Sequence, residues 1–153
     1  MPSDLWSFAV HFYQREGIEE ACLQLQEAGA DVCLLLAGAW LGQRGVAFAT
    51  ERADCLRAIA TPWQAEVISP LRTLRQAWRA RAQTDEALGG LREQLKALEL
   101  SAERQLLLRL ESAAQAWPED EARNTQLWLW GLADESGSQA PEALRRLREA
   151  LGD

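Results

Sequence analysis

The chain has 153 residues, of which 48% are hydrophobic and 25% are charged, and its formal net charge at pH 7 is −7. This length and apolar fraction predict a single globular domain over residues 1–153 and exclude a disordered chain. The acidic balance argues against a general nucleic-acid binder, because such domains are normally basic, but it allows a local basic patch.

Good helix formers and capping residues divide the first sixty residues into helices. We expect helices from Ser3 or Asp4 to Gln14, over residues 18–28, over residues 31–42, and from Thr50 to Ala60. The longest apolar run, "VCLLLAGAWLG" (32–42), has about half of the ~20 residues that a membrane span needs. It therefore predicts no membrane span but a central helix that is buried on all sides.

The segment "TPWQ" (61–64) indicates the start of another helix, over residues 61–82. Thr61 can cap this helix, and Pro62 fits its first turn, where a missing N–H is tolerated. Pro70 falls inside the helix, removes one of its hydrogen bonds and predicts a kink or a break.

The second half of the chain is also predicted to be helical. Residues 85–117 are expected to form either one long helix, as a hairpin arm, or a pair of helices, and the pattern leaves both open. We expect Pro118 to begin a helix that carries "LWLWGL" (127–132), residues 134–141 to form a flexible loop, and Pro141 to begin a short last helix.

These elements together predict the fold class. No stretch shows the strict alternation that is typical of a strand. The sequence therefore predicts an all-α protein, a compact bundle of six to eight helices around the buried helix 31–42 and the Pro-kinked helix 61–82.

The residues that usually carry catalysis or bind metals are scarce. His11 is the one histidine and lies on the polar side of the first helix, with no nucleophile and acid framed around it. The cysteines Cys22, Cys33 and Cys55 have no CxxC spacing, so we expect reduced, buried thiols of a cytoplasmic protein and neither a zinc site nor disulfides. We predict no catalytic residue, no metal ligand and no cofactor, and we lean against an enzyme while leaving that possibility open.

Arginines are concentrated in one helix, since residues 67–84 contain four arginines and no acidic residue. On an ideal helix Arg72, Arg75 and Arg79 lie within about 60° of one another, at the border of the apolar stripe that begins at Trp63. These four residues are the predicted binding site, a groove that receives an acidic or phosphorylated group. The alternative is that the arginines neutralise carboxylates of the same chain, with their stems over the edge of the core.

Seven tryptophans are the other unusual feature of the composition. Trp128 and Trp130 are two residues apart, so they cannot share one helix face, and we expect one of them at the surface or in an interface. Four others lie on apolar stripes and are predicted to be core residues: Trp6, Trp40, Trp63 and Trp78.

The stretch "LWSFAVHFYQREGIEEACLQLQEAGADVCLLLAGAWLG", with the later "ATPWQAEVISPLRTLRQAWR", resembles a small uncharacterised family of all-helical proteobacterial proteins, a domain of unknown function. The similarity covers about residues 4–80. The resemblance implies a cytoplasmic bacterial protein with a helical fold, and it implies no activity, cofactor or catalytic residue.

Three functional hypotheses follow. The first is a non-catalytic cytoplasmic interaction or regulatory module whose partner, expected to be a protein, presents an acidic or phosphorylated group to the arginine groove. The alternative is an enzyme or carrier for an apolar anionic ligand, such as a prenyl or acyl phosphate, held inside the bundle. A third hypothesis is local RNA contact through the arginine helix, which the acidic composition makes the weakest of the three. The sequence does not predict the oligomeric state.

Overall fold

The apolar run near the N-terminus forms the centre of the protein. In the computed structural model this run is helix α3 (Val32–Gln43). The structure describes residues 4–152 and, within this range, all side chains except those of residues 135 and 136. Every residue from 33 to 42 is buried. Asp31 caps the helix by accepting a hydrogen bond from the N–H of Leu34 at 3.3 Å. The prediction of a helix buried on all sides is confirmed.

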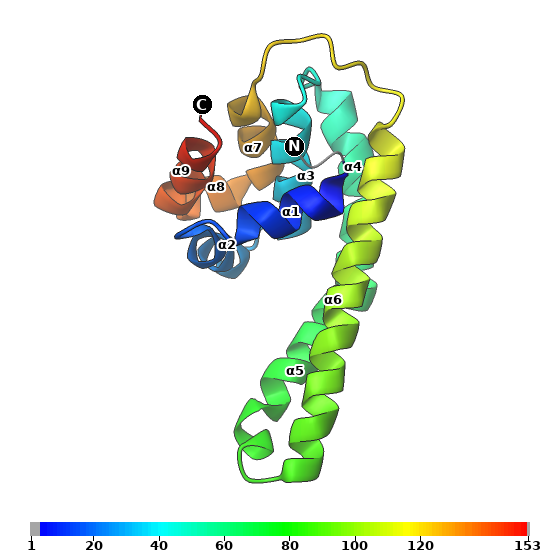
Figure 1. The fold of residues 1–153 in the computed structure, drawn as a ribbon, viewed down its shortest axis with the longest axis vertical. Helices are drawn as coiled ribbons and strands as arrows, with labels where there is room; N and C mark the ends of the chain where they lie inside the picture. The colour runs from blue at the N-terminus through cyan, green and yellow to red at the C-terminus, as the bar shows by residue number, and fades with distance from the viewer. Residues whose placement is uncertain (1–3, 153) are drawn as a thin grey trace.

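Short helices surround α3 and form a globular part that we call the head (Figure 1). Helix α7 packs along α3, and α9 packs against α2. The bounds are α1 (Leu5–Tyr13), α2 (Ile18–Glu27), α7 (Thr125–Ala133), α8 (Glu135–Gln139) and α9 (Pro141–Ala150).

Glycines allow α3 and α7 to approach closely. A Cβ atom on Gly42 would lie 2.6 Å from the Cα atom of Thr125, and a Cβ atom on Gly38 would lie 2.7 Å from a methyl group of Leu132. Real Cβ atoms do not come this near to other heavy atoms, so the contact requires glycine at position 42, where the neighbour is backbone, whereas at position 38 the methyl group of Leu132 would have to move.

The next helical segments form one continuous rod. Helix α4 (Thr50–Trp63) passes into a π-helical turn, η1 (Gln64–Ile68), and then into α5 (Ser69–Ala82). The predicted helix start at Thr61 is therefore wrong, because α4 continues through Pro62. The interruption expected from Pro70 is confirmed, since the π turn directly precedes this proline, whose ring would otherwise meet a carbonyl one turn earlier.

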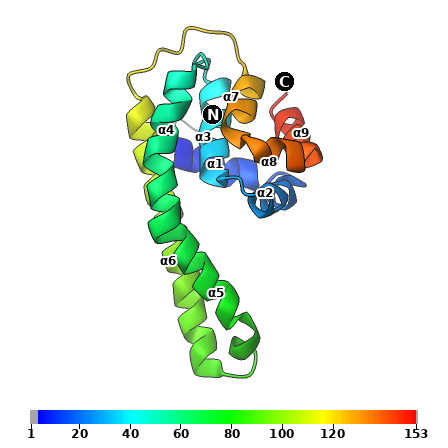
Figure 2. The same ribbon diagram turned by 180° about the vertical axis from the view of Figure 1, so that it is seen from behind.

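The long helix α6 (Glu86–Ala114) settles the alternative that the sequence left open. Its 29 residues form one helix, which extends for about 43 Å at 1.5 Å per residue. Its N-terminal half and α5 lie antiparallel and project from the head as a helical hairpin, which we call the arm (Figures 1 and 2). With α4, η1 and α5 counted as one helix, the described residues contain eight helices and no strand, as the fold prediction required.

Two local predictions in the last third are wrong. Pro118 does not begin a helix, because residues 118–124 form an irregular segment over the end of α3, where the N–H of Glu121 donates to the carbonyl of Gly45 at 2.9 Å. The helix begins at Thr125 instead, with Asn124 as its cap. The predicted loop at 134–141 contains the short helix α8, whereas the last helix does begin at Pro141.

The single-residue predictions of burial hold in part, since Cys22, Cys33 and Trp40 are buried as predicted. Trp128 is buried while Trp130 is 63% exposed, so one of this pair does lie at the surface. Cys55 is exposed, contrary to prediction, because α4 turns Ala53, Leu56 and Ala60 toward the core and Cys55 away from it. The predicted core tryptophans divide into one that is buried, Trp40, and three that are half-buried: Trp6, Trp63 and Trp78. Within the described part of the chain, no helix combines the length and the apolar character that a membrane crossing requires.

Candidate functional site

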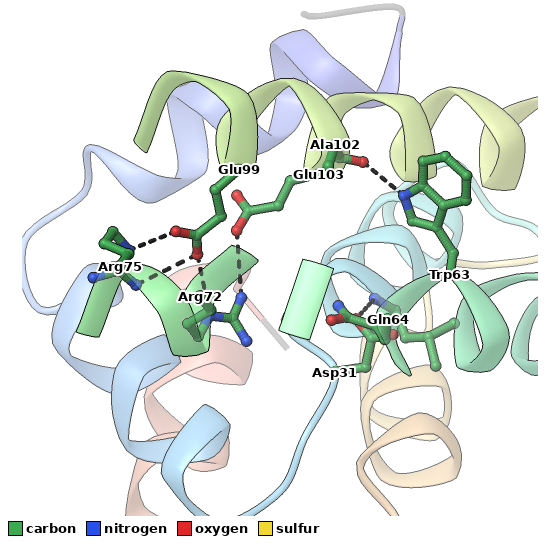
Figure 3. A network of polar contacts seen from close by, with 9 residues as sticks. Asp31, Trp63, Gln64, Arg72, Arg75, Glu99, Ala102 and Glu103 are labelled. Carbon is green, nitrogen blue, oxygen red and sulfur yellow. Dashed lines mark hydrogen bonds and ion pairs between the residues drawn. The ribbon is translucent and has the colours of Figure 1, made fainter. Parts of the chain in front are cut away.

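The arginine row of α5 faces carboxylates of α6 (Figure 3). The Nε atom of Arg75 lies 2.5 Å from Oε1 of Glu99, and the Nε atom of Arg72 lies 3.2 Å from Oε2 of the same carboxylate. Arg72 also approaches Glu103, at 3.4 Å. The alternative of intramolecular pairing therefore describes Arg72 and Arg75.

Glu99 is the centre of this network. Its side chain is only 8% exposed, and its two oxygens bond to two different guanidinium groups. A buried carboxylate is stable only when it is paired and hydrogen-bonded, so Glu99 needs both arginines. Arg92 strengthens the same contact between α5 and α6 by donating from Nε to the carbonyl of Arg75 at 2.9 Å.

The other two residues of the predicted site lie elsewhere. Trp63 donates its indole N–H to the carbonyl of Ala102 at 2.9 Å, and the guanidinium of Arg109 lies 4.0 Å from the centre of its ring. Arg79 is exposed and has no carboxylate partner among the residues that the structure describes. Sixteen residues of one continuous rod, about 24 Å, separate Trp63 from Arg79, so the four residues do not gather in one groove.

A cavity of about 340 Å³ opens beside Arg72, between α1, the start of α3, η1 and α6. Its walls are mostly apolar and come from three helices, as shown by Trp6, Val10, Leu36 and Leu107. Its polar residues include Gln64, Arg72, Glu103 and Tyr13. Ligand sites in proteins have this character: an apolar hollow with a few polar groups that fix orientation.

Two carboxyl groups near the polar end of the cavity are poorly compensated. Asp31 accepts a hydrogen bond from the side-chain amide of Gln64 at 2.9 Å, but its Oδ2 atom is buried without a hydrogen-bond partner among the described residues. Burial raises the pKa of Asp31. Burial, and then the charge of Glu99, raises the pKa of Glu103 despite the proximity of Arg72.

The charges around this end therefore favour a neutral or positive guest. Two guanidinium groups, Arg72 and Arg75, stand against three carboxyl groups, Asp31, Glu99 and Glu103. The arginine that lines the cavity is already shared between two of these carboxylates. The site thus differs from the electropositive groove that the arginine row alone predicted.

The cavity offers no activated nucleophile among its described residues. Burial raises the pKa of Tyr13 to about 12 and raises the pKa of the Cys33 thiol well above its usual value. Both groups are protonated at neutral pH, and a protonated thiol or phenol is a weak nucleophile. The lining can therefore bind and orient a ligand, and it does not show the chemistry of a covalent catalyst.

Reasoning from the sequence did not find the carboxylates or the cavity. One signal was present, because Glu99 falls on the seam of α6 that otherwise carries Leu88, Leu95, Ala102 and Leu106. An acid on an apolar seam opposite an arginine row predicts a buried pair. The cavity had no comparable signal, because its lining residues are as far apart as Trp6 and Leu107.

Comparison with known proteins identifies a family and no relative of established function. The family described as "Protein of unknown function (DUF2390)" matches residues 4–110. Neither a curated protein nor a solved structure matches the chain. The matched region contains the arm and every residue that lines the cavity, whereas α7, α8 and α9 lie outside it.

Proposed function

The chain belongs to the DUF2390 family, and we propose that it is a non-catalytic cytoplasmic binding protein that holds a small, largely apolar ligand in the cavity beside Arg72. The cavity carries the proposal, since its volume of about 340 Å³ and its apolar walls match those of small-molecule sites. The cytoplasmic location rests on the free thiols, which are typical of a reducing compartment.

The charges at the polar end select the head group of the ligand. A phosphate or carboxylate would need the guanidinium of Arg72, which Glu99 and Glu103 already occupy. An amine would instead compensate Glu103, whose burial is only partly offset by Arg72. The proposal therefore keeps the apolar ligand of the alternative hypothesis and replaces its anionic head with an amine.

Matched ligands with one chain and three heads test this assignment. Isothermal titration calorimetry with 1-octylamine, 1-octanol and octanoate at neutral pH should give binding in that order of affinity. Glu103→Gln should weaken 1-octylamine by about tenfold, ~1.4 kcal/mol, and leave 1-octanol unchanged. Tightest binding of octanoate would overturn the choice of head group.

Occupancy of the cavity needs its own control. Val10 is half-buried and lines the cavity, so Val10→Phe should fill part of it and weaken all binding probes together. Leu23→Phe, on an exposed face of α2 outside the cavity, should leave their affinities unchanged. If none of the three probes binds the wild type, or if both variants bind them equally, the cavity is not the site.

The interaction module remains a second candidate at the far end of α5. Arg79 and Arg81 are both exposed there, and neither has a carboxylate partner among the described side chains. This favours contact with an acidic or phosphorylated protein segment. Binding of a phosphorylated peptide that is lost in Arg79→Glu, at unchanged stability, would support this candidate, and binding that survives the substitution would exclude it.

A further inference from the structure

Helix α6 carries a second seam on its outer side, in addition to the one that packs against the arm and the head. Along this side residues recur at spacings of 4, 3, 4, 3, 4 and 3, and all of them are exposed. The outer seam consists of Ala87, Leu91, Gln94, Leu98, Ser101, Gln105 and Leu108. Its leucines are 51%, 55% and 45% exposed, in chain order.

The fold of one chain does not use this seam. The leucines that hold α6 to its own chain lie on a different side, and among them Leu95 and Leu106 are buried. Figures 1 and 2 show α6 at one edge of the molecule, with α4 and α5 beside it, and the seam residues are exposed from one end of the seam to the other. An alternating 3-4 spacing sustained over 22 residues, about 33 Å of helix, is the pattern by which two helices pack along their length.

We propose that the outer seam pairs with the outer seam of a second copy of this chain, antiparallel, with the two-fold axis passing between residues 99 and 100. About this axis the seam is self-complementary. Leu91 faces Leu108 of the second copy, and Gln94 faces Gln105 of the second copy. Leu98 faces Ser101, and the small Ala87 faces the small Ser112 at the ends of the contact.

The shape of the chain favours the antiparallel orientation. The C-terminal half of α6 is flanked by α1, through Trp6, which lies beneath Arg104, and by α4, through Trp63, which bonds to Ala102. Among the described elements, α5 is the one that packs along the N-terminal half, as the arm in Figure 1 shows. An antiparallel pair lays the slim arm of each copy along the head of the other, whereas a parallel pair would bring two heads to the same place.

Charge complementarity points to a second copy of this chain as the occupant. The seam contains no charged residue. In the antiparallel register the exposed Glu93 of one copy, which bonds to Lys96 of its own chain at 3.1 Å, lies within about 3 Å along the helix axis of the level of the exposed Arg104 of the other, and the two-fold axis repeats this approach. Two glutamines within the seam lower the stability of such a contact, so the dimer is reversible and depends on concentration.

The mass of the protein in solution tests the dimer. Sedimentation equilibrium over a wide range of concentrations should show a shift from one chain of 17.1 kDa toward twice that mass. Leu98→Glu, which puts a carboxylate on both sides of the axis, should weaken dimerisation by about 100-fold. Leu23→Glu changes a leucine of similar exposure on α2 and should not affect the mass. A wild type that stays monomeric at every concentration would overturn the proposal.

Crosslinking tests the orientation without relying on a destabilising variant. In a Cys55→Ser background, which removes the one exposed native thiol, a mixture of Gln94→Cys and Gln105→Cys chains should form a disulfide-linked dimer on mild oxidation. Either variant alone should not do so. Efficient crosslinking of Gln94→Cys with itself would show a parallel pair and refute the antiparallel contact.

Discussion

Charge reversal at Arg75 should cost far more stability than the same change one turn further along α5. Arg75 bonds to the buried carboxylate of Glu99, whereas Arg79 is exposed and has no such partner among the described residues. Losing a charged hydrogen bond costs about 1.5–3 kcal/mol. A new carboxylate about 5 Å from Glu99 adds about 3 kcal/mol at an effective dielectric constant of 20, which Arg72 partly offsets.

The expected loss for Arg75→Glu is therefore about 3–5 kcal/mol in the free energy of unfolding, toward the lower end because the Arg75 side chain is 24% exposed. Arg79→Glu should change the same quantity by less than about 0.5 kcal/mol. Urea unfolding followed by circular dichroism at 222 nm measures both. A double-mutant cycle with Glu99→Gln should show strong coupling for Arg75 and none for Arg79. A loss below about 1 kcal/mol for Arg75→Glu, or equal losses for both variants, would refute the reasoning.

Two further predictions concern the core and the thiols. Gly42→Ala should lower the free energy of unfolding, measured with urea, by about 2 kcal/mol or more, because the new methyl group would meet the backbone of Thr125. Gly90→Ala is the control and should not lower the free energy of unfolding, because the space around Gly90 is open. A thiol reagent at pH 8 should modify only Cys55 in the native protein and three thiols in urea, since burial raises the pKa of Cys22 to about 12 and the remaining thiol is also buried. Rapid native modification of more than one thiol would contradict the second prediction.

The sequence predicted a helix well wherever the residues that determine the helix are neighbours in the chain. The apolar run that became α3, the cap at Asp31 and the start at Pro141 each need only neighbouring residues to act. The same reasoning failed at Pro62, which was predicted to lie in the first turn of a helix. A proline can also lie inside a helix when tertiary contacts stabilise the helix on both sides of it, and α4 continues through Pro62 in this way. The reasoning failed again at Pro118, where backbone hydrogen bonds from Glu121 and Asn124 to the end of α3 hold the chain in an irregular segment.

The binding site depends on contacts that no single segment encodes. The arginine row was visible in the sequence, but its partners lie 24 to 31 residues away on another helix. The leucines of α6 illustrate the same limit, because Leu88, Leu91, Leu95 and Leu98 follow one another at spacings of 3, 4 and 3, as the residues of a single apolar stripe do. The structure divides it into Leu88 and Leu95 on the inner side and Leu91 and Leu98 on the outer side. Only the packing of α5 on α6 decides which side is the interior.

The π-helical turn at Gln64–Ile68 makes the two connections between head and arm unequal. Helix α6 passes from head to arm as an unbroken α-helix, whereas its neighbour changes its hydrogen-bonding pattern between Pro62 and Pro70. Helices bend at π turns and prolines, so any bend of the arm relative to the head would be centred at this turn. Gln64 lies there, bonded to Asp31 and lining the cavity, so such a bend would change the shape of the cavity wall.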